Sequence, residues 1–188
     1  MGRPARIDRA QVLAEALSLA DEQGLEALTM GLLAERLGVT PMALYRHVGN
    51  KADLLDGLVE LLLTEFPPPS AEMNWSERLS ALAGGIRASA RRHPAVFPLL
   101  LQRPASTPQG RRTREAVYQA LAEAGIAEDR LAQVERLVST AILGFAVSEV
   151  AGRFRNQSRR QLDADFEVLR ALLSEFIQSQ SSNDAVRS

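Results

Sequence analysis

Between Thr29 and Lys51 the sequence gathers side chains that bind anions and planar ring edges. Tyr45 carries a phenol, Arg46 a guanidinium and His47 an imidazole, in three consecutive positions. Lys51 follows shortly and is the one lysine among 22 basic residues. Guanidinium and ammonium groups pair with phosphate oxygens, and arginine donates two parallel hydrogen bonds to the edge of guanine. A protein core does not require this combination on one segment, whereas the DNA major groove accepts it.

Two short helical patterns would position these groups. Gly38 can adopt the left-handed conformation that ends a first helix, about 30–37, and Thr40 can cap a second, about 41–47. Proline suits the first position of a helix, where its missing N–H has no partner. The pattern predicts a helix-turn-helix whose apolar residues face inward. Its outward residues are then Pro41, Met42, Ala43, Tyr45, Arg46 and His47.

Composition limits the class of protein. The chain has 188 residues, is 46% hydrophobic and contains no cysteine. It has no signal-like N-terminus and no charge-free apolar stretch of ~18 residues, so we expect a soluble, cytoplasmic protein without a membrane segment. A net charge of −1 argues against general coating of nucleic acid, so DNA contacts must come from local charge, which includes Arg3 and Arg6 in the N-terminal arm. With two histidines and no cysteine, no metal-site spacing exists, and we expect no cofactor.

Helical periodicity recurs along the whole chain, so we predict an all-α fold. Asp8 should cap a helix that ends at Gln23 before Gly24, and Asn50 with Asp53 should cap the helix 51–66. We predict a three-helix DNA-binding domain over 1–50, the connecting helix 51–66, and a ligand-binding and dimerisation domain over 67–188, starting at a proline run.

The second domain should contain four long helices. We expect them from Asn74 to about His93, from Pro108 to Ala124, over about 128–153 and over about 162–178, with a frayed polar tail. The third is apolar nearly all round, and the last repeats apolar residues at 4-3-4-3 spacing. Too few other helices remain to cover them, so we predict a homodimer joined through a four-helix bundle.

The N-terminal third of the chain resembles the TetR family of transcriptional regulators. The segments LADEQGLEALTM and LLAERLGVTPMALYRHVGNKADLL carry the resemblance, and HPAVFPLLLQRP is similar to some members further on. The resemblance implies an N-terminal DNA-binding domain, a C-terminal ligand-binding domain and no enzymatic activity. Where family members often have arginine this chain has Gly31, and Met30 replaces a small polar residue, so the target sequence is expected to differ.

The resemblance also implies roles for individual residues. Tyr45 and Lys51 fall on positions that hold DNA phosphates, and Thr40 on a helix-start position that often does the same. We also place Thr29 at the DNA surface, as the cap of the first helix of the motif. The positions expected to meet base edges, thymine methyls or nearby backbone are Pro41, Met42, Ala43, Arg46 and His47.

Each of these residues also has a purely structural interpretation. Lys51 could be a solvated lysine, and Tyr45 a half-buried core aromatic. His47 could pack or cap within the domain, and Arg3 and Arg6 could belong to an arm without contacts. On DNA we expect the arm to reach the backbone or minor groove.

In the second domain, apolar residues could form either core or ligand pocket. Glu149 interrupts an apolar helix, and because an unpaired buried carboxylate is costly, we expect it to meet either a dimer partner or a polar ligand group. His93, beside Pro94, is expected to be a helix-end cap rather than a metal ligand. The candidate pocket residues are Leu82, Ile86, Phe97, Leu100, Val117, Tyr118, Leu121, Ile142, Phe145 and Glu149.

These observations favour a ligand-responsive DNA-binding regulator. We expect a dimeric repressor that binds a near-palindromic double-stranded operator and is released by a small, largely apolar inducer. An enzyme is the first alternative, although no nucleophile–base pair, phosphate-binding loop or metal cluster is present. A helical small-molecule carrier is the second, and it leaves Tyr45, Arg46 and Lys51 unexplained.

Overall fold

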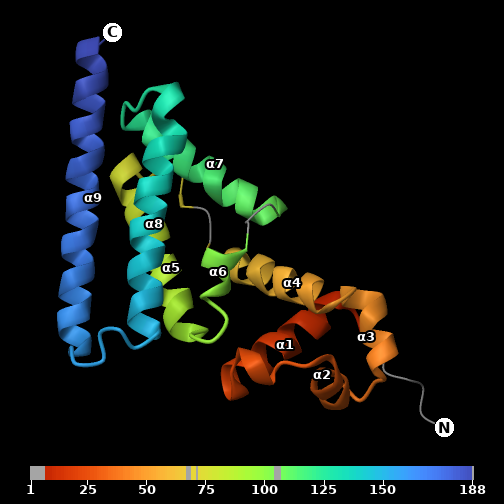
Figure 1. Ribbon diagram of the computed structural model, residues 1–188. Helices are drawn as coiled ribbons and strands as arrows, with labels where there is room; N and C mark the ends of the chain where they lie inside the picture. The colour runs from red at the N-terminus through yellow and green to blue at the C-terminus, as the bar shows by residue number, and fades with distance from the viewer. Residues whose placement is uncertain (1–6, 67–68, 71, 104–106, 188) are drawn as a thin grey trace. The chain divides into compact units, whose positions relative to one another are not determined.

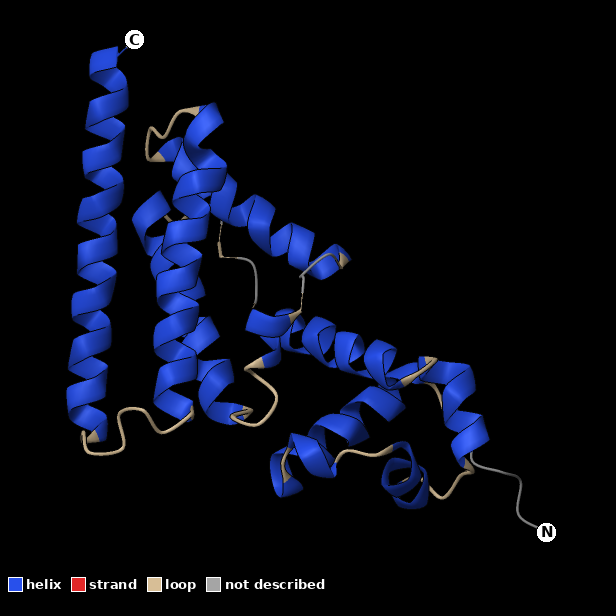
Figure 2. Cartoon of the chain, viewed as in Figure 1, coloured by secondary structure: helices blue, strands red, loops and turns tan. Residues whose placement is uncertain are grey.

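A computed structural model describes residues 7–66, 69–70, 72–103 and 107–187, with side chains described through Ser182. Within these ranges every regular element is a helix and none is a strand, which confirms the all-α prediction (Figures 1 and 2). The chain forms two compact units. Unit 1 comprises Met1–Thr64 and His93–Ala105, and unit 2 comprises Glu65–Arg92 and Ser106–Ser188.

Unit 1 is built around the first helix, whose apolar face is packed by three others. Val12, Ala16 and Leu19 are fully buried there, together with Leu44 and Leu58 from the helices that cover them. The unit contains α1 (Arg9–Gln23), a 3₁₀ turn (Leu25–Ala27), α2 (Met30–Arg36), α3 (Pro41–Val48), α4 (Lys51–Thr64) and the short α6 (Leu99–Gln102).

The helix ends follow the capping signals of the sequence. Asp8 and Gln11 form a reciprocal capping box at the start of α1, and Gly24 follows its last residue. Asn50 and Asp53 form the corresponding contacts at the start of α4. Gly49 has φ +65°, and a Cβ there would lie 2.2 Å from Oδ2 of Asp53, so the turn between α3 and α4 requires glycine.

The segment after α5 joins unit 1, which differs from the predicted division at the proline run. Nδ1 of His93 lies 2.6 Å from Oδ2 of Asp21 on α1, and His93 is 8% exposed. Arg103 donates to the backbone oxygen of Ala52, at 3.1 Å, and pairs with Asp56, both on α4. Long-range polar contacts therefore tie residues 93–103 to helices that precede them by about 50 to 70 positions.

Unit 2 is a bundle of four long helices, α5 (Trp75–Arg92), α7 (Pro108–Glu123), α8 (Leu131–Val150) and α9 (Arg159–Arg187). Helix α8 packs against the other three and follows a 3₁₀ turn (Glu128–Arg130). One core cluster includes Leu121, Val134 and Ile177, and another includes Ile142 and Phe166. As predicted, Asn74 and Glu77 cap the start of α5, with backbone to side-chain distances of 2.9 and 3.0 Å.

Helix α9 is longer than the sequence pattern indicated. The predicted span was about 162–178 with a frayed tail, but the helix begins at Arg159 and continues to Arg187. Ser158 and Gln161 form a capping box, with N–H to side-chain distances of 3.0 and 3.3 Å, which moves the start forward. No proline or glycine occurs from 159 to 187, so nothing in the local sequence stops the helix after the last apolar residue. The prediction of a frayed tail was therefore wrong.

The segment Glu128–Val150 is the one helical stretch, among the described residues, that is long and apolar enough to cross a membrane. Part of its apolar surface lies in the bundle core, where Val134 and Ala146 are fully buried. Within one chain, however, only 22% of its most apolar 18-residue stretch is buried. Leu137, 53% exposed, lies on the uncovered side.

Candidate nucleic-acid interface and ligand cavity

The helix-turn-helix of unit 1, residues 30–48, forms a corner between α2 and α3 that carries the side chains selected from the sequence. Gly38 ends α2 with φ +65°, and the N–H of Val39 donates to the oxygen of Ala34 across the turn. Pro41 is the first residue of α3, as expected. Because Leu44 and Val48 are buried against the rest of unit 1, the opposite side of α3 faces solvent.

That outer side carries most of the predicted contact residues. Met42 is 67% and Tyr45 47% exposed, and Arg46 and Pro41 are also exposed. Ala43 and His47 lie at the edge, half-buried. Tyr45 is therefore not the core aromatic considered as its alternative, whereas the half-buried position of His47 leaves both of its interpretations open.

The two threonines serve as helix caps. Oγ1 of Thr29 accepts from the N–H of Leu32 at 3.2 Å, and Oγ1 of Thr40 accepts from the N–H of Ala43 at 3.3 Å. Both residues are exposed. A hydroxyl that accepts from the backbone still has its own proton to donate, so each can hold the helix and bind an acceptor oxygen at the same time.

Lys51 is the first residue of α4 and is exposed. Two N–H groups of this helix end are already bonded, because Oδ1 of Asn50 accepts from the N–H of Ala52, at 2.7 Å, and from that of Asp53, at 3.1 Å. An anion at this helix end would thus be held chiefly by the lysine side chain.

A salt bridge that the sequence analysis missed fixes α2 on α1. Nε of Arg36 lies 2.6 Å from Glu15, and its Nη1 lies 2.6 Å from Glu22. The hydrogen bond from Arg36, helped by one from Ser18, lowers the pKa of Glu22 below its usual range. Arg36 is thereby engaged in positioning the corner. Arg3 and Arg6 lie outside the described residues.

Unit 2 contains a cavity of about 150 Å³ between α5, α7 and the residues that follow α4. Of the predicted pocket residues, Leu82 lines it. Ile142 lines a smaller space of about 30 Å³ near Trp75. The described residues around the larger cavity are Phe66, Leu82, Gln109, Arg112, Thr113 and Ala116.

The other predicted pocket residues lie elsewhere. Ile86 and Phe145 pack on the core cluster of Ile142, Val117 packs on that of Leu121, which is fully buried, and Tyr118 is half-buried. Phe97 and Leu100 belong to unit 1, where Phe97 is fully buried. Sequence reasoning missed the α7 residues because it followed only apolar positions. The sequence did contain a signal for them, because Gln109, Arg112 and Thr113 are polar and their i, i+3, i+4 spacing places them on one side of the helix.

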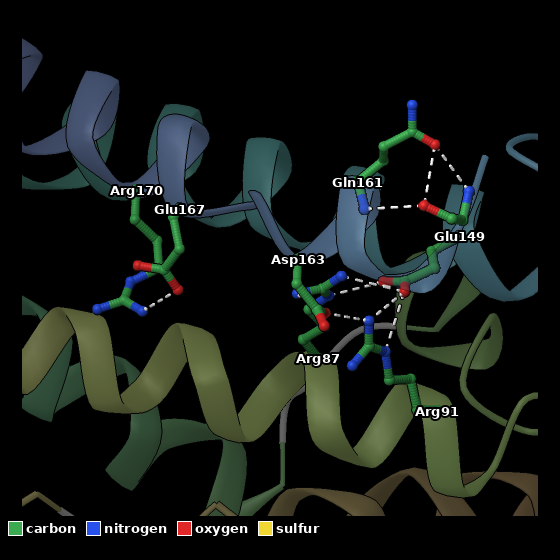
Figure 3. Close-up of polar contacts among 8 residues, drawn as sticks. Arg87, Arg91, Glu149, Gln161, Asp163, Glu167 and Arg170 are labelled. Carbon is green, nitrogen blue, oxygen red and sulfur yellow. Dashed lines mark hydrogen bonds and ion pairs between the residues drawn. The ribbon is translucent and has the colours of Figure 1, made fainter. Parts of the chain in front are cut away.

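Glu149 pairs with two arginines of the same chain, which we did not consider from the sequence (Figure 3). Nε of Arg87 lies 2.7 Å from Oε2 of Glu149, and Nη2 of Arg91 lies 2.6 Å from Oε1. Asp163 of α9 lies 3.0 Å from Arg87 and 2.7 Å from Arg91. The i, i+4 spacing of the two arginines on α5 was visible in the sequence, but the helix they would face was not.

Electrostatics and packing hold this cluster together. Burial by itself raises the pKa of Glu149, but the hydrogen bonds from Arg87 and Arg91 outweigh burial, so the pKa is lowered overall. The Arg87 guanidinium carbon also lies 4.6 Å from the ring centre of Phe166 and 5.4 Å from that of Phe145. The cluster joins α5, α8 and α9, and every charge in it has a counter-charge.

His93 has a partner that we did not consider from the sequence. Its ring Nδ1 lies 2.6 Å from Oδ2 of Asp21 on α1. Its role in the structure is to attach the segment after α5 to α1.

Comparisons with known proteins agree on both halves of the chain. Residues 12–58 match the family described as bacterial regulatory proteins, tetR family, and residues 67–185 match the tetracyclin repressor-like C-terminal domain. The transcriptional repressor DrrR1 of Streptomyces coeruleorubidus is 28% identical over 158 residues, which are 83% of this chain and 58% of DrrR1. The chain spans about three fifths of the length of two such curated relatives.

Solved structures give the same result. BioQ of Mycobacterium smegmatis, in the structure with its double-stranded DNA operator, is 27% identical with a TM-score of 0.75, over 90% of this chain and 99% of that one. A TetR variant from Acinetobacter baumannii AYE in complex with minocycline is 28% identical with a TM-score of 0.79, over 93% of this chain and 95% of that one.

Proposed function

Because the chain belongs to the TetR family of bacterial transcriptional regulators, we propose that it is a dimeric repressor released from its DNA operator by a small molecule. The observation that carries the proposal is the exposed outer side of α3, where Tyr45 and Arg46 are held outward by a buried Leu44. BioQ, a relative of the same fold, has been solved with its operator. DNA binding takes place in the cytoplasm, which is the location we propose.

The contacts divide into two classes. Tyr45, Lys51 and the hydroxyls of Thr29 and Thr40 hold phosphates and set the position of α3. Arg46 reads a guanine through O6 and N7. The remaining α3 residues, Pro41, Met42, Ala43 and His47, contact base edges or thymine methyls, and Arg3 and Arg6 reach the backbone or minor groove.

The dimer forms through the uncovered sides of α8 and α9. Leu137 on α8 and Val168 and Leu172 on α9 are 53%, 58% and 56% exposed in the single chain. Gly144 lies seven residues after Leu137 and therefore on the same side of α8, and a Cβ built there meets nothing within 4 Å. A small residue beside large exposed ones allows two helices to approach closely. Two such dimer-related corners read half-sites about one helical turn, ~34–36 Å, apart.

The 150 Å³ cavity is the proposed effector site. One of its walls, Phe66, comes two residues after the last residue of α4, the helix that begins at Lys51. A ligand that presses on Phe66 acts on α4 through the chain itself. It must favour the released state over the DNA-bound state, and a coupling of ~1–3 kcal/mol gives a useful switch.

The alternatives make different predictions in one experiment. A radiolabelled fragment of the DNA that flanks the protein's own gene is titrated with the protein at several salt concentrations. A repressor produces a sequence-selective band shift that weakens steeply with salt. A small-molecule carrier or an enzyme produces none, and the absence of such a shift on flanking and genomic fragments would reject the proposal.

A further inference from the structure

The cavity of unit 2 has two chemically different walls. Phe66 and Leu82 are 4% and 5% exposed and form an apolar wall. Gln109, Arg112 and Thr113 form a polar wall, and Ala116 closes the space between them. The three polar residues stand at i, i+3 and i+4 on α7, so they share one side of the helix. A cavity near 150 Å³ holds about one benzene ring.

Arg112 is exposed on α7, at the edge of this cavity. It makes no hydrogen bond or ion pair with the residues that the structure describes, and none of the described lining residues is acidic. Other arginines of unit 2 do pair with carboxylates of the same chain, namely Arg78 with Glu123, Arg87 and Arg91 with Glu149, Arg92 with Glu65 and Arg170 with Glu167.

Lack of a partner alone does not identify a ligand site. Arg114, two residues further along α7, is also exposed and does not line the cavity. What distinguishes Arg112 is its place at the edge of an apolar space, beside the side-chain amide of Gln109, which can donate to the same ligand. A guanidinium in that position prefers a planar anion, with which it forms two parallel hydrogen bonds.

We infer that the effector is an organic acid with one apolar ring, whose carboxylate or similarly charged oxygens pair with Arg112 while the ring packs on Phe66 and Leu82. Gln109 donates a further hydrogen bond from its side-chain amide that orients the charged group, whereas the Thr113 hydroxyl donates to the backbone oxygen of Gln109 at 3.1 Å. This inference rests on the proposed function for the statement that the bound molecule is the effector. The ligand preference of the cavity does not depend on it.

The test compares two probes that differ in charge and little in shape, benzoate and benzamide. Their binding to the full-length protein is measured by ligand-observed NMR and by calorimetric titration. Benzoate should bind about tenfold more tightly than benzamide, because only benzoate forms charge-assisted hydrogen bonds with the guanidinium. Equal affinities, or no binding of benzoate, would overturn the inference.

Variants test whether the charged group of the probe binds at Arg112. Arg112→Gln should remove the difference between the probes, and the matched control Arg114→Gln should preserve it, since both substitutions delete one exposed positive charge from α7. Ala116→Leu fills the cavity and should abolish binding of both probes. A preference for benzoate that survives in Arg112→Gln would show that the anion binds elsewhere.

The result is separable from that of the repressor proposal. If the protein gives no selective band shift but discriminates the probes through Arg112, only the repressor proposal fails. If it shifts DNA but does not discriminate the probes, only the acid inference fails. Thermal unfolding of each variant confirms that the compared proteins are folded.

Discussion

Removal of the Glu149 carboxylate should destabilise the α5–α8–α9 bundle by an amount that depends on pH. Glu149 and Arg87 side chains are each 8% exposed, and the substitution Glu149→Gln keeps the shape but leaves two arginines without their shared partner. Loss of one member of a buried ion pair costs about 3–5 kcal/mol. Asp163 stays within 3.0 Å of Arg87 and Arg91 is 26% exposed, so we expect about 2–3 kcal/mol here.

The pH dependence has a definite sign. The pKa of Glu149 is lowered in the folded protein, so its contribution to stability is complete above the pKa of the unfolded state and is lost as the pH falls through the folded value. The difference between wild type and Glu149→Gln should therefore be largest near pH 7 and shrink below about pH 4.3.

Urea unfolding followed by circular dichroism at several pH values measures this difference, and Glu175→Gln, an exposed change on α9, serves as the control. In thermal scans the variant should melt about 4–12 °C lower at neutral pH, since 1 kcal/mol shifts the melting temperature of a chain of this size by about 2–4 °C. Two results would refute the assignment of the cluster as a stabilising network. One is a free energy of unfolding of Glu149→Gln within about 0.5 kcal/mol of wild type, and the other is a stability difference that is the same at pH 7 and pH 4.

Three further predictions concern the interface, the dimer and the corner. Lys51→Ala should weaken binding to all DNA sequences alike and reduce the slope of log affinity against log salt by about 1, whereas Arg46→Ala should change the preference at one base pair. Quantitative band shifts on an operator library check both, and an equal loss on every sequence for Arg46→Ala would reject its role as a reader. Gly144→Leu should leave the fold of the single chain intact but shift sedimentation from dimer to monomer, and an unchanged dimer would contradict the proposed α8 contact. Thr40→Ala removes the α3 cap and should cost about 1 kcal/mol of stability in urea unfolding, with a larger loss of DNA affinity than stability alone explains. DNA affinity that falls only in step with stability would show that the hydroxyl does not touch DNA.

The local architecture was predictable because its signals act over a few residues. The helix-turn-helix spacing, the proline at the start of α3 and the paired caps Asn50–Asp53 and Asn74–Glu77 each satisfy backbone groups within one turn. For the same reason the exposed position of Tyr45 followed from the burial of its neighbour Leu44.

The partners of distant charged residues were not predictable in this way. From the sequence we expected Glu149 to meet a dimer partner or a ligand and His93 to cap a helix, because the sequence does not show which helices are adjacent. Glu149 instead meets Arg87, 62 positions away, and His93 meets Asp21, 72 positions away. The residues that line the cavity were not predictable either, since apolar periodicity marks the buried side of a helix and cannot distinguish a core from a space beside it.

By itself, therefore, the sequence determined the helices, their caps and which side chains of α3 face outward. These features depend on hydrogen bonds and periodicities that span at most about one or two helical turns. Only the tertiary structure decided which charges neutralise one another, where the segment after α5 attaches and which polar wall borders the cavity. Those outcomes depend on the packing of helices that are far apart in the chain, where burial makes an unpaired charge costly and so selects one arrangement.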